Sequence, residues 1–208
     1  MFPKRQKNIP LREKYVSEPL GLTSPASGDP APGGSSPRPP GPCPGRRSGG
    51  AAGAPATPLE LLETVWNSYA EADRFAVVGG DFSEENAVEN APGKFSLADP
   101  DTVEATLGLP AADVSKVTDC ATLSHMMNSN TFTCGVFATE DAAGVAKILE
   151  DSLMNTHWIC GFPDLVRLYT LGNYVVEIYG AQELVDEFSE KLTAAYPDAV
   201  MVCDKPIA

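Results

Sequence analysis

Residues 164–180 read DLVRLYTLGNYVVEIYG, and this stretch decides the fold class. Two runs with alternating apolar residues flank Gly172-Asn173, a pair that favours a two-residue hairpin turn. When Leu171 is placed opposite Tyr174, Thr170 and Glu177 fall on one face of the hairpin. The other face is the more apolar one, and we expect helices to cover it; it carries Tyr169, Leu171, Tyr174, Val176 and Ile178.

The sequence on both sides of this hairpin predicts further helices and strands. Residues 140–155 predict a helix, because Glu140 and Asp141 suit its positive end and apolar residues follow at helical spacing. Residues 182–196 predict another helix, and AVMVC at 199–203 predicts a last strand. Upstream, residues 114–128 and 131–138 predict two strands joined by a turn at 128–130.

The region before these strands begins with a strong helix signal. Thr57, Pro58 and Glu60 match a capping box with proline at the first helical position, and the helix should run to about Asp73. Residues 74–98 predict little regular structure, and residues 99–108 predict a short second helix. The order of elements predicts an α+β two-layer sandwich, in which helices cover one face of a mostly antiparallel sheet.

Composition divides the chain into two parts. Residues 1–58 contain 13 of the 19 prolines and 9 of the 18 glycines, which favours disorder. We therefore expect a disordered Pro/Gly-rich tail or linker at 1–56 and an acidic α+β domain at 57–208. Residues 59–208 carry 7 basic and 25 acidic residues, a net charge of −18. This charge argues against nucleic acid as a partner.

The amino terminus lacks the apolar run of a secretory signal, and no stretch has the length of a membrane-spanning helix. With this start the chain would be cytoplasmic, and it would reach a membrane only through an anchor absent from this sequence.

The domain nevertheless resembles a known family in the order of its motifs. These are TPLELLETVWNSYAE, GGDFSEEN, NAPGKF, TLGLPA, HMMNSNTFTCGVF, WICGFPD, GNYVVEIYG and AAYPDAVMVCDKPIA. Together they resemble uncharacterised cell-envelope lipoproteins of clostridial gut bacteria, often labelled bacteriocin transport accessory proteins. The resemblance covers about residues 57–208. It implies export and a location in the cell envelope or outside the cell, and it implies no catalytic residue.

The stretch HWICGFPD at 157–164 is similar to a thioredoxin-like redox turn, but Pro163 stands where the second cysteine would be. The cysteines of the domain are therefore expected to be buried. In an exported protein, Cys160 would instead form a structural disulfide with Cys134 or Cys203. A redox role for Cys160 is the alternative.

Metal sites and catalytic motifs are weakly indicated. His125, Met126, Met127 and Cys134 offer copper ligands, but neighbouring strand residues point to opposite faces, so we expect one methionine to pack in the core. The acidic runs at 81–86 and 99–104 lack the order of a calcium-binding loop. We expect no cofactor, no metal and no catalytic site.

Three aromatic residues are candidates for a groove that binds a peptide or glycan: Trp66, Trp158 and Phe162. The alternative is that they pack in the core or at its rim. The sequence predicts a non-enzymatic binding or accessory module of the bacterial cell envelope, with an unknown partner such as an envelope protein or peptide. The second hypothesis is a thiol-disulfide redox accessory protein that uses Cys160.

Overall fold

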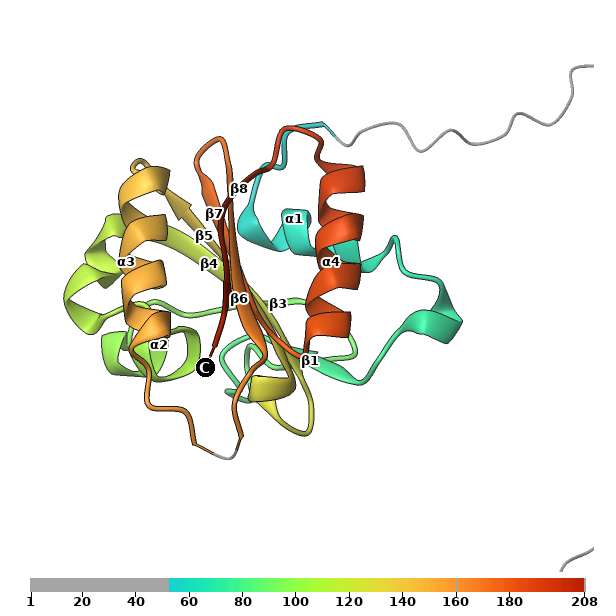
Figure 1. Ribbon diagram of the computed structural model, residues 1–208, viewed down its shortest axis with the longest axis horizontal. Coiled ribbons are helices and arrows are strands. Elements are labelled where there is room, and N and C mark those ends of the chain that lie inside the picture. The colour runs from blue at the N-terminus through green and yellow to red at the C-terminus, as the bar shows by residue number, and fades with distance from the viewer. Residues whose placement is uncertain (1–52, 160, 208) are drawn as a thin grey trace, which may run out of the picture. The chain divides into compact units, whose positions relative to one another are not determined.

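The computed structural model describes residues 53–159 and 161–207, which all belong to one compact unit. Figure 1 shows this unit with its sheet nearly edge-on between two pairs of helices. One face of the sheet is covered by α1 and α4, and the other by α2 and α3. The helices are α1 (Pro58–Trp66), α2 (Pro100–Leu107), α3 (Ala142–Met154) and α4 (Gln182–Ala195).

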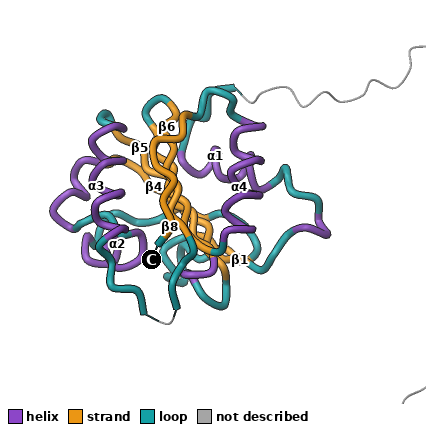
Figure 2. Tube along the Cα trace, in the orientation of Figure 1, coloured by secondary structure: helices purple, strands orange, loops and turns teal. Residues whose placement is uncertain are grey.

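The sheet has eight strands, and every pairing between them is antiparallel. The strand order is β2-β1-β4-β5-β7-β6-β8, with β3 also paired to β4. Figure 2 shows the strands as one twisted layer. Their bounds are β1 (Val77–Gly79), β2 (Val88–Glu89), β3 (Gly93–Lys94), β4 (Val117–His125), β5 (Phe132–Thr139), β6 (Leu165–Leu171), β7 (Tyr174–Gly180) and β8 (Val200–Pro206).

The predicted α+β class and the mostly antiparallel sheet are confirmed. The predicted hairpin is also confirmed, since β6 and β7 pair with Leu171 opposite Tyr174 and Gly172 has a φ of 54°. The prediction that helices cover only one face is wrong, because α2 and α3 bury the second face as well. The domain is therefore a three-layer arrangement.

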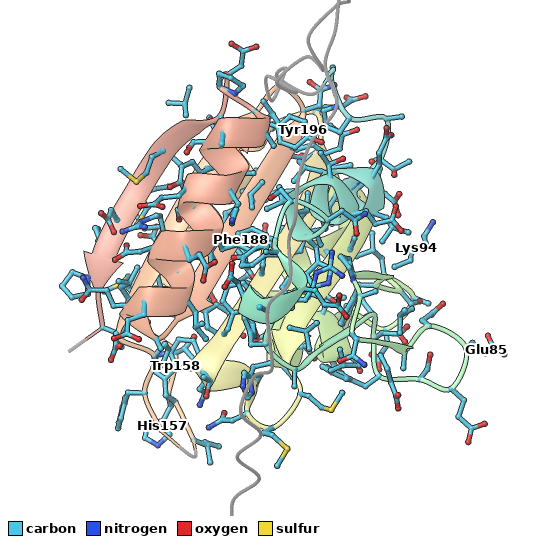
Figure 3. The ribbon with its side chains drawn as sticks, turned by 90° about the vertical axis from the view of Figure 1, so that its right-hand side faces the viewer. Glu85, Lys94, His157, Trp158, Phe188 and Tyr196 are labelled. Atoms are coloured by element: carbon cyan, nitrogen blue, oxygen red, sulfur yellow. The ribbon has the colours of Figure 1, made fainter. Side chains whose placement is uncertain are left out.

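The first core lies between the sheet and the helices α1 and α4. Its aromatic centre is Trp66, Phe132 and Phe188, all nearly or fully buried. Figure 3 shows Phe188 on the inner side of α4, facing α1. Full burial of one such side chain stabilises the fold by about 1.5–3 kcal/mol, so this core holds α4 on the sheet.

The second core lies between the sheet and the helices α2 and α3. Leu107 from α2 and Leu149 from α3 pack with Phe137 and Val175 on the sheet. Glu177 and Thr122 are buried on the same face. Because these strand residues are polar, the sequence pattern of this face is that of a solvent-exposed face. The sequence therefore did not predict that α2 and α3 cover it.

The first helix is shorter than predicted, since α1 ends at Trp66 and only a short 3-10 turn follows at Glu71–Asp73. Ser68 donates its hydroxyl proton to the Val65 carbonyl, a local bond that competes with helix continuation. The cap predicted at Thr57 is confirmed, since its side chain accepts a hydrogen bond from the Glu60 backbone. Asp99 and Asp141 are the N-caps of α2 and α3.

The region predicted to be irregular, 74–98, contains the short strands β1, β2 and β3. A Cβ atom on Gly79 would lie 2.1 Å from the backbone nitrogen of Gly93, so glycine is required where these segments meet. The predicted tail lies, up to residue 52, outside the described residues.

Candidate functional site

Three neighbouring hollows lie beside the α3–β6 connection and the beginning of α4, two segments at the bottom of Figure 1. The first has a volume of about 300 Å³, and the second, which shares Asn130 with it, about 130 Å³. The third, of about 550 Å³, shares Asp164 with the second. We call this surface the sheet-end groove and define it by Phe82, Asn130, Trp158, Ile159, Phe162, Asp164 and Glu183.

Phe82 enters the groove from a loop whose conformation is fixed by a carboxylate. Asp81 accepts hydrogen bonds from the backbone and hydroxyl of Ser83 and from the Asn86 amide. Partial desolvation raises the pKa of Asp81, but these hydrogen bonds outweigh it and hold the pKa below its ordinary value. Phe82 itself has a φ of 60° and a side chain that is 51% exposed.

A positive φ is unusual for a bulky residue and costs conformational energy. At Phe82 this cost accompanies a second one, the exposure of an aromatic ring to water. The two costs coincide at a residue that lines a hollow. The hydrogen bonds of Asp81 hold the loop that places Phe82 at the first hollow.

The connection between α3 and β6 forms the opposite wall of the groove. Trp158 packs against Tyr179 with a ring separation of 5.1 Å, and Figure 3 shows it at the end of the sheet beside His157. The Asn130 amide donates to the carbonyls of Ile159 and Gly161, at 2.7 Å and 2.9 Å. These bonds fix the connection on both sides of residue 160.

Two large apolar side chains on this wall face solvent. Ile159 is 73% exposed and Phe162 is 71% exposed, although Pro163 next to Phe162 is buried. Asp164 begins the return to the sheet, because its backbone nitrogen donates to Gly180 and its carboxylate accepts from the Gln182 backbone. The groove thus has apolar side chains held on a well-bonded backbone.

The charge around the groove is negative. Asp164, Glu183 and Asp186 line the third hollow, and Glu84 and Glu85 follow Phe82 in its loop. Figure 3 shows Glu85 pointing away from the helices. Over residues 59–208 the sequence has 25 acidic and 7 basic residues, so the field near the groove favours cations.

The three candidate aromatics occupy two different environments. Trp158 and Phe162 line two adjoining hollows of the sheet-end groove, Trp158 as a partly buried residue at the rim of the second core and Phe162 as an exposed one. Trp66 is 2% exposed, donates its indole proton to the Asn90 carbonyl and packs on Tyr69 and Phe75 in the first core. Trp66 therefore offers no ring to a ligand.

The described cysteines are unbridged and buried, and Cys160 lies outside the described residues. Cys134 belongs to the first core and Cys203 to the second, on opposite faces of the sheet. Burial, with a smaller contribution from Glu177, raises the pKa of Cys120 and Cys134 well above the ordinary value. Burial and then Glu150 raise that of Cys203. These three thiols are neutral at pH 7 and poor nucleophiles.

Metal-binding geometry is absent from the described part of the chain, where no group of three His, Cys, Asp or Glu side chains could hold an ion. The expectation that one methionine packs in the core is wrong, since Met126 and Met127 are both exposed. Their strand ends at His125, so the alternation of faces no longer applies to them. The acidic run at 99–104 forms the beginning of α2, and Asp99 is the N-cap of this helix.

A larger hollow of about 740 Å³ lies at the other end of the sheet, between the β6–β7 turn and the end of α4. Tyr174 and Tyr196 line it together with Ala54 and Pro55.

Sequence reasoning missed Phe82, Asn130 and Ile159. Phe82 and Asn130 lie on segments far apart in the chain, and only the fold brings them beside the α3–β6 connection. The available signal was the aromatic residue inside the acidic run DFSEEN.

Among the described residues, no helix is both long and apolar enough to cross a membrane. Comparison of the chain with protein-family models, curated proteins and solved structures gives no match.

Proposed function

We propose that this domain is a non-enzymatic binding or accessory module, and that its sheet-end groove holds a basic segment of a partner protein that carries apolar side chains. The observation that carries the proposal is the presentation of Phe82, Ile159 and Phe162 at adjoining hollows. Large exposed apolar side chains grouped in this way mark interaction sites on soluble proteins.

The acidic residues at the groove favour a partner with basic side chains. Asp164 and Glu183 at one end of the groove and Glu84 and Glu85 at the other would attract lysine and arginine side chains. A second copy of this chain is disfavoured, because two domains with this excess of acidic residues repel each other. A membrane surface rich in anionic lipid is disfavoured for the same reason.

A location in the cell envelope is part of the proposal and rests on the resemblance described above. It is tested by fractionating the native host and detecting the protein with an antibody. Recovery from the envelope or medium supports the location, and recovery from the cytoplasm alone contradicts it.

The binding proposal is tested with the full-length protein and a labelled peptide of lysine and leucine at helical spacing, about 14 residues long. The peptide should bind, and fluorescence anisotropy should show weaker binding as salt is added. The triple variant Phe82→Ser, Ile159→Ser, Phe162→Ser should weaken binding by about tenfold or more, because exposed aromatic and aliphatic anchors dominate such contacts.

Three controls make this test specific. Val88→Ser changes an exposed apolar residue in β2, which lies outside the groove lining, and should leave affinity unchanged. A glutamate–leucine peptide should not bind. The third control is a lysine–leucine peptide with a scrambled sequence. If it bound wild type as tightly as the original peptide does, and bound the triple variant equally well, attraction by charge alone would explain the binding, and this would contradict the proposed site.

A further inference from the structure

The outer edge of β8 is a second surface that is open to a partner, and it shares Asp186 with the third hollow of the sheet-end groove. Among the described strands β8 pairs only with β6, and it ends the strand order of the sheet. It is seven residues long, whereas β1, β2 and β3 at the opposite edge have two or three residues each. Its outer backbone groups form a ready template for another strand.

The first half of β8 is apolar and exposed, and it carries no charged residue and no proline. Val200, Met201 and Val202 are 59%, 51% and 47% exposed. The second half carries the charged residues Asp204 and Lys205 and ends at Pro206, all of which protect an edge. The first half has one protecting feature, the bulge that leaves Val202 without a partner on β6. Pairing of an added strand is therefore favoured along the first half.

A hollow lies directly beside this half of β8. It has a volume of about 270 Å³ and lies between α3 and the strands β6 and β8. Val202, which has no partner in the register between β6 and β8, lines it together with Ala143 and Ala146 of α3. The small alanine side chains leave room there for an apolar side chain of an added strand.

Charges beside the strand favour a basic occupant. On the α4 side, Arg167 is shared by Asp186 and Asp204, at 2.9 Å and 3.1 Å, which leaves one negative charge in excess. On the α3 side, Lys147 and Lys205 balance Glu150 and Asp151. A second copy of this acidic chain would add like charge, whereas a basic segment would neutralise the excess.

We propose that β8 and the hollow beside α3 bind an extended segment of a basic partner protein by strand addition. Backbone hydrogen bonds to β8 would supply affinity, and an apolar side chain in the hollow would supply selectivity. Alternate basic side chains of the segment would lie on the α4 side, near Asp186 and Asp204.

The test uses the full-length protein and a capped peptide of alternating lysine and valine, about eight residues long to match a strand. Binding should shift the NMR signals of the Val200–Val202 amides and slow their hydrogen exchange. A peptide of the same sequence with methyl groups on alternate backbone nitrogens should not bind, because it cannot donate the hydrogen bonds of a strand.

Ala143→Leu fills the hollow from an exposed helix position and should weaken binding by about tenfold, as the loss of one buried apolar contact implies. Ala194→Leu, at an exposed position of α4, is the matched control and should change nothing. The triple groove variant described above should also bind normally.

Three results would overturn the proposal. Equal binding of the methylated peptide would exclude strand pairing, and loss of binding in the groove variant would place the peptide at the other site. A dimer in sedimentation equilibrium whose β8 amides are protected without peptide would show that a second copy is the occupant.

Discussion

Glu177 is a carboxylic acid in the interior of the sheet. It is 0% exposed, and neither oxygen of its side chain has a hydrogen-bond partner among residues 53–159 and 161–207. It faces Gly135 on β5, where the missing side chain leaves space for the carboxyl group. Burial disfavours the charged form and so raises the pKa of Glu177 well above its ordinary value.

The protonation of Glu177 makes stability depend on pH. Its pKa is higher in the folded than in the unfolded chain, so its contribution is intact below the unfolded pKa of 4.5 and is lost as pH rises toward the folded value. Each pH unit in this window costs about 1.4 kcal/mol. Glu177→Gln should remove this slope, and urea unfolding at several pH values from acid to mildly alkaline measures it.

Glu183→Gln, at an exposed position of α4, is the control and should keep the wild-type slope. If the free energy of unfolding changed with pH in the same way in wild type and Glu177→Gln, this would contradict the conclusion that Glu177 causes the pH dependence. Burial, followed by the charge of Glu177, raises the pKa values of Tyr179, Cys120 and Cys134, so these groups ionise at higher pH.

At the scale of single elements, the helices owe their positions to caps that are readable in the sequence. Asp141 accepts a hydrogen bond from the Gly144 backbone at 2.9 Å and so begins α3. Gly108 ends α2 with a φ of 68° and lies against Leu153 of α3. These caps place α2 and α3 side by side over the second face of the sheet.

Asp141→Ala should lower the free energy of unfolding by about 1 kcal/mol, the usual cost of losing an N-terminal cap. Asp141→Asn should recover most of the loss, because its side-chain oxygen also accepts from Gly144. Thermal or urea unfolding measures both variants. An alanine variant as stable as wild type would show that the cap contributes nothing to α3.

The long elements could be predicted from the sequence because their signals are local: caps, turns and apolar spacing. The cover of the second face could not be predicted, since Glu177 and Thr122 on that face are polar yet buried. Of the three aromatic residues that the sequence offered for a groove, Trp158 and Phe162 lie at adjoining hollows, and their role as a groove stays a prediction. Phe82 was missed because its exposure depends on a backbone conformation held by Asp81 and Asn86.

At the scale of the whole molecule, charge is the dominant property. Residues 59–208 carry 18 more negative than positive charges, so the folded domain repels itself. Several ion pairs offset this locally, such as those of Arg167 with Asp186 and Asp204. They are too few to remove the excess.

Salt should therefore stabilise the domain. Raising sodium chloride from about 0.02 M to about 0.5 M shortens the screening length severalfold and weakens the repulsion more than it weakens the close ion pairs. We expect the melting temperature to rise by a few degrees, about the shift that 1 kcal/mol gives in a domain of this size. A melting temperature that falls with salt would show that the ion pairs outweigh the repulsion.

The strand order also has a consequence for biosynthesis. β8 completes one edge of the sheet, but it is made after β4, β5, β6 and β7. A nascent chain that has emerged only as far as α4 exposes the unpaired edge of β6. In that chain Leu168 does not yet have its strand partner Cys203 beside it. The ribosome must therefore deliver residues 200–206 before the sheet is complete, and until then β6 can pair with a neighbouring nascent chain.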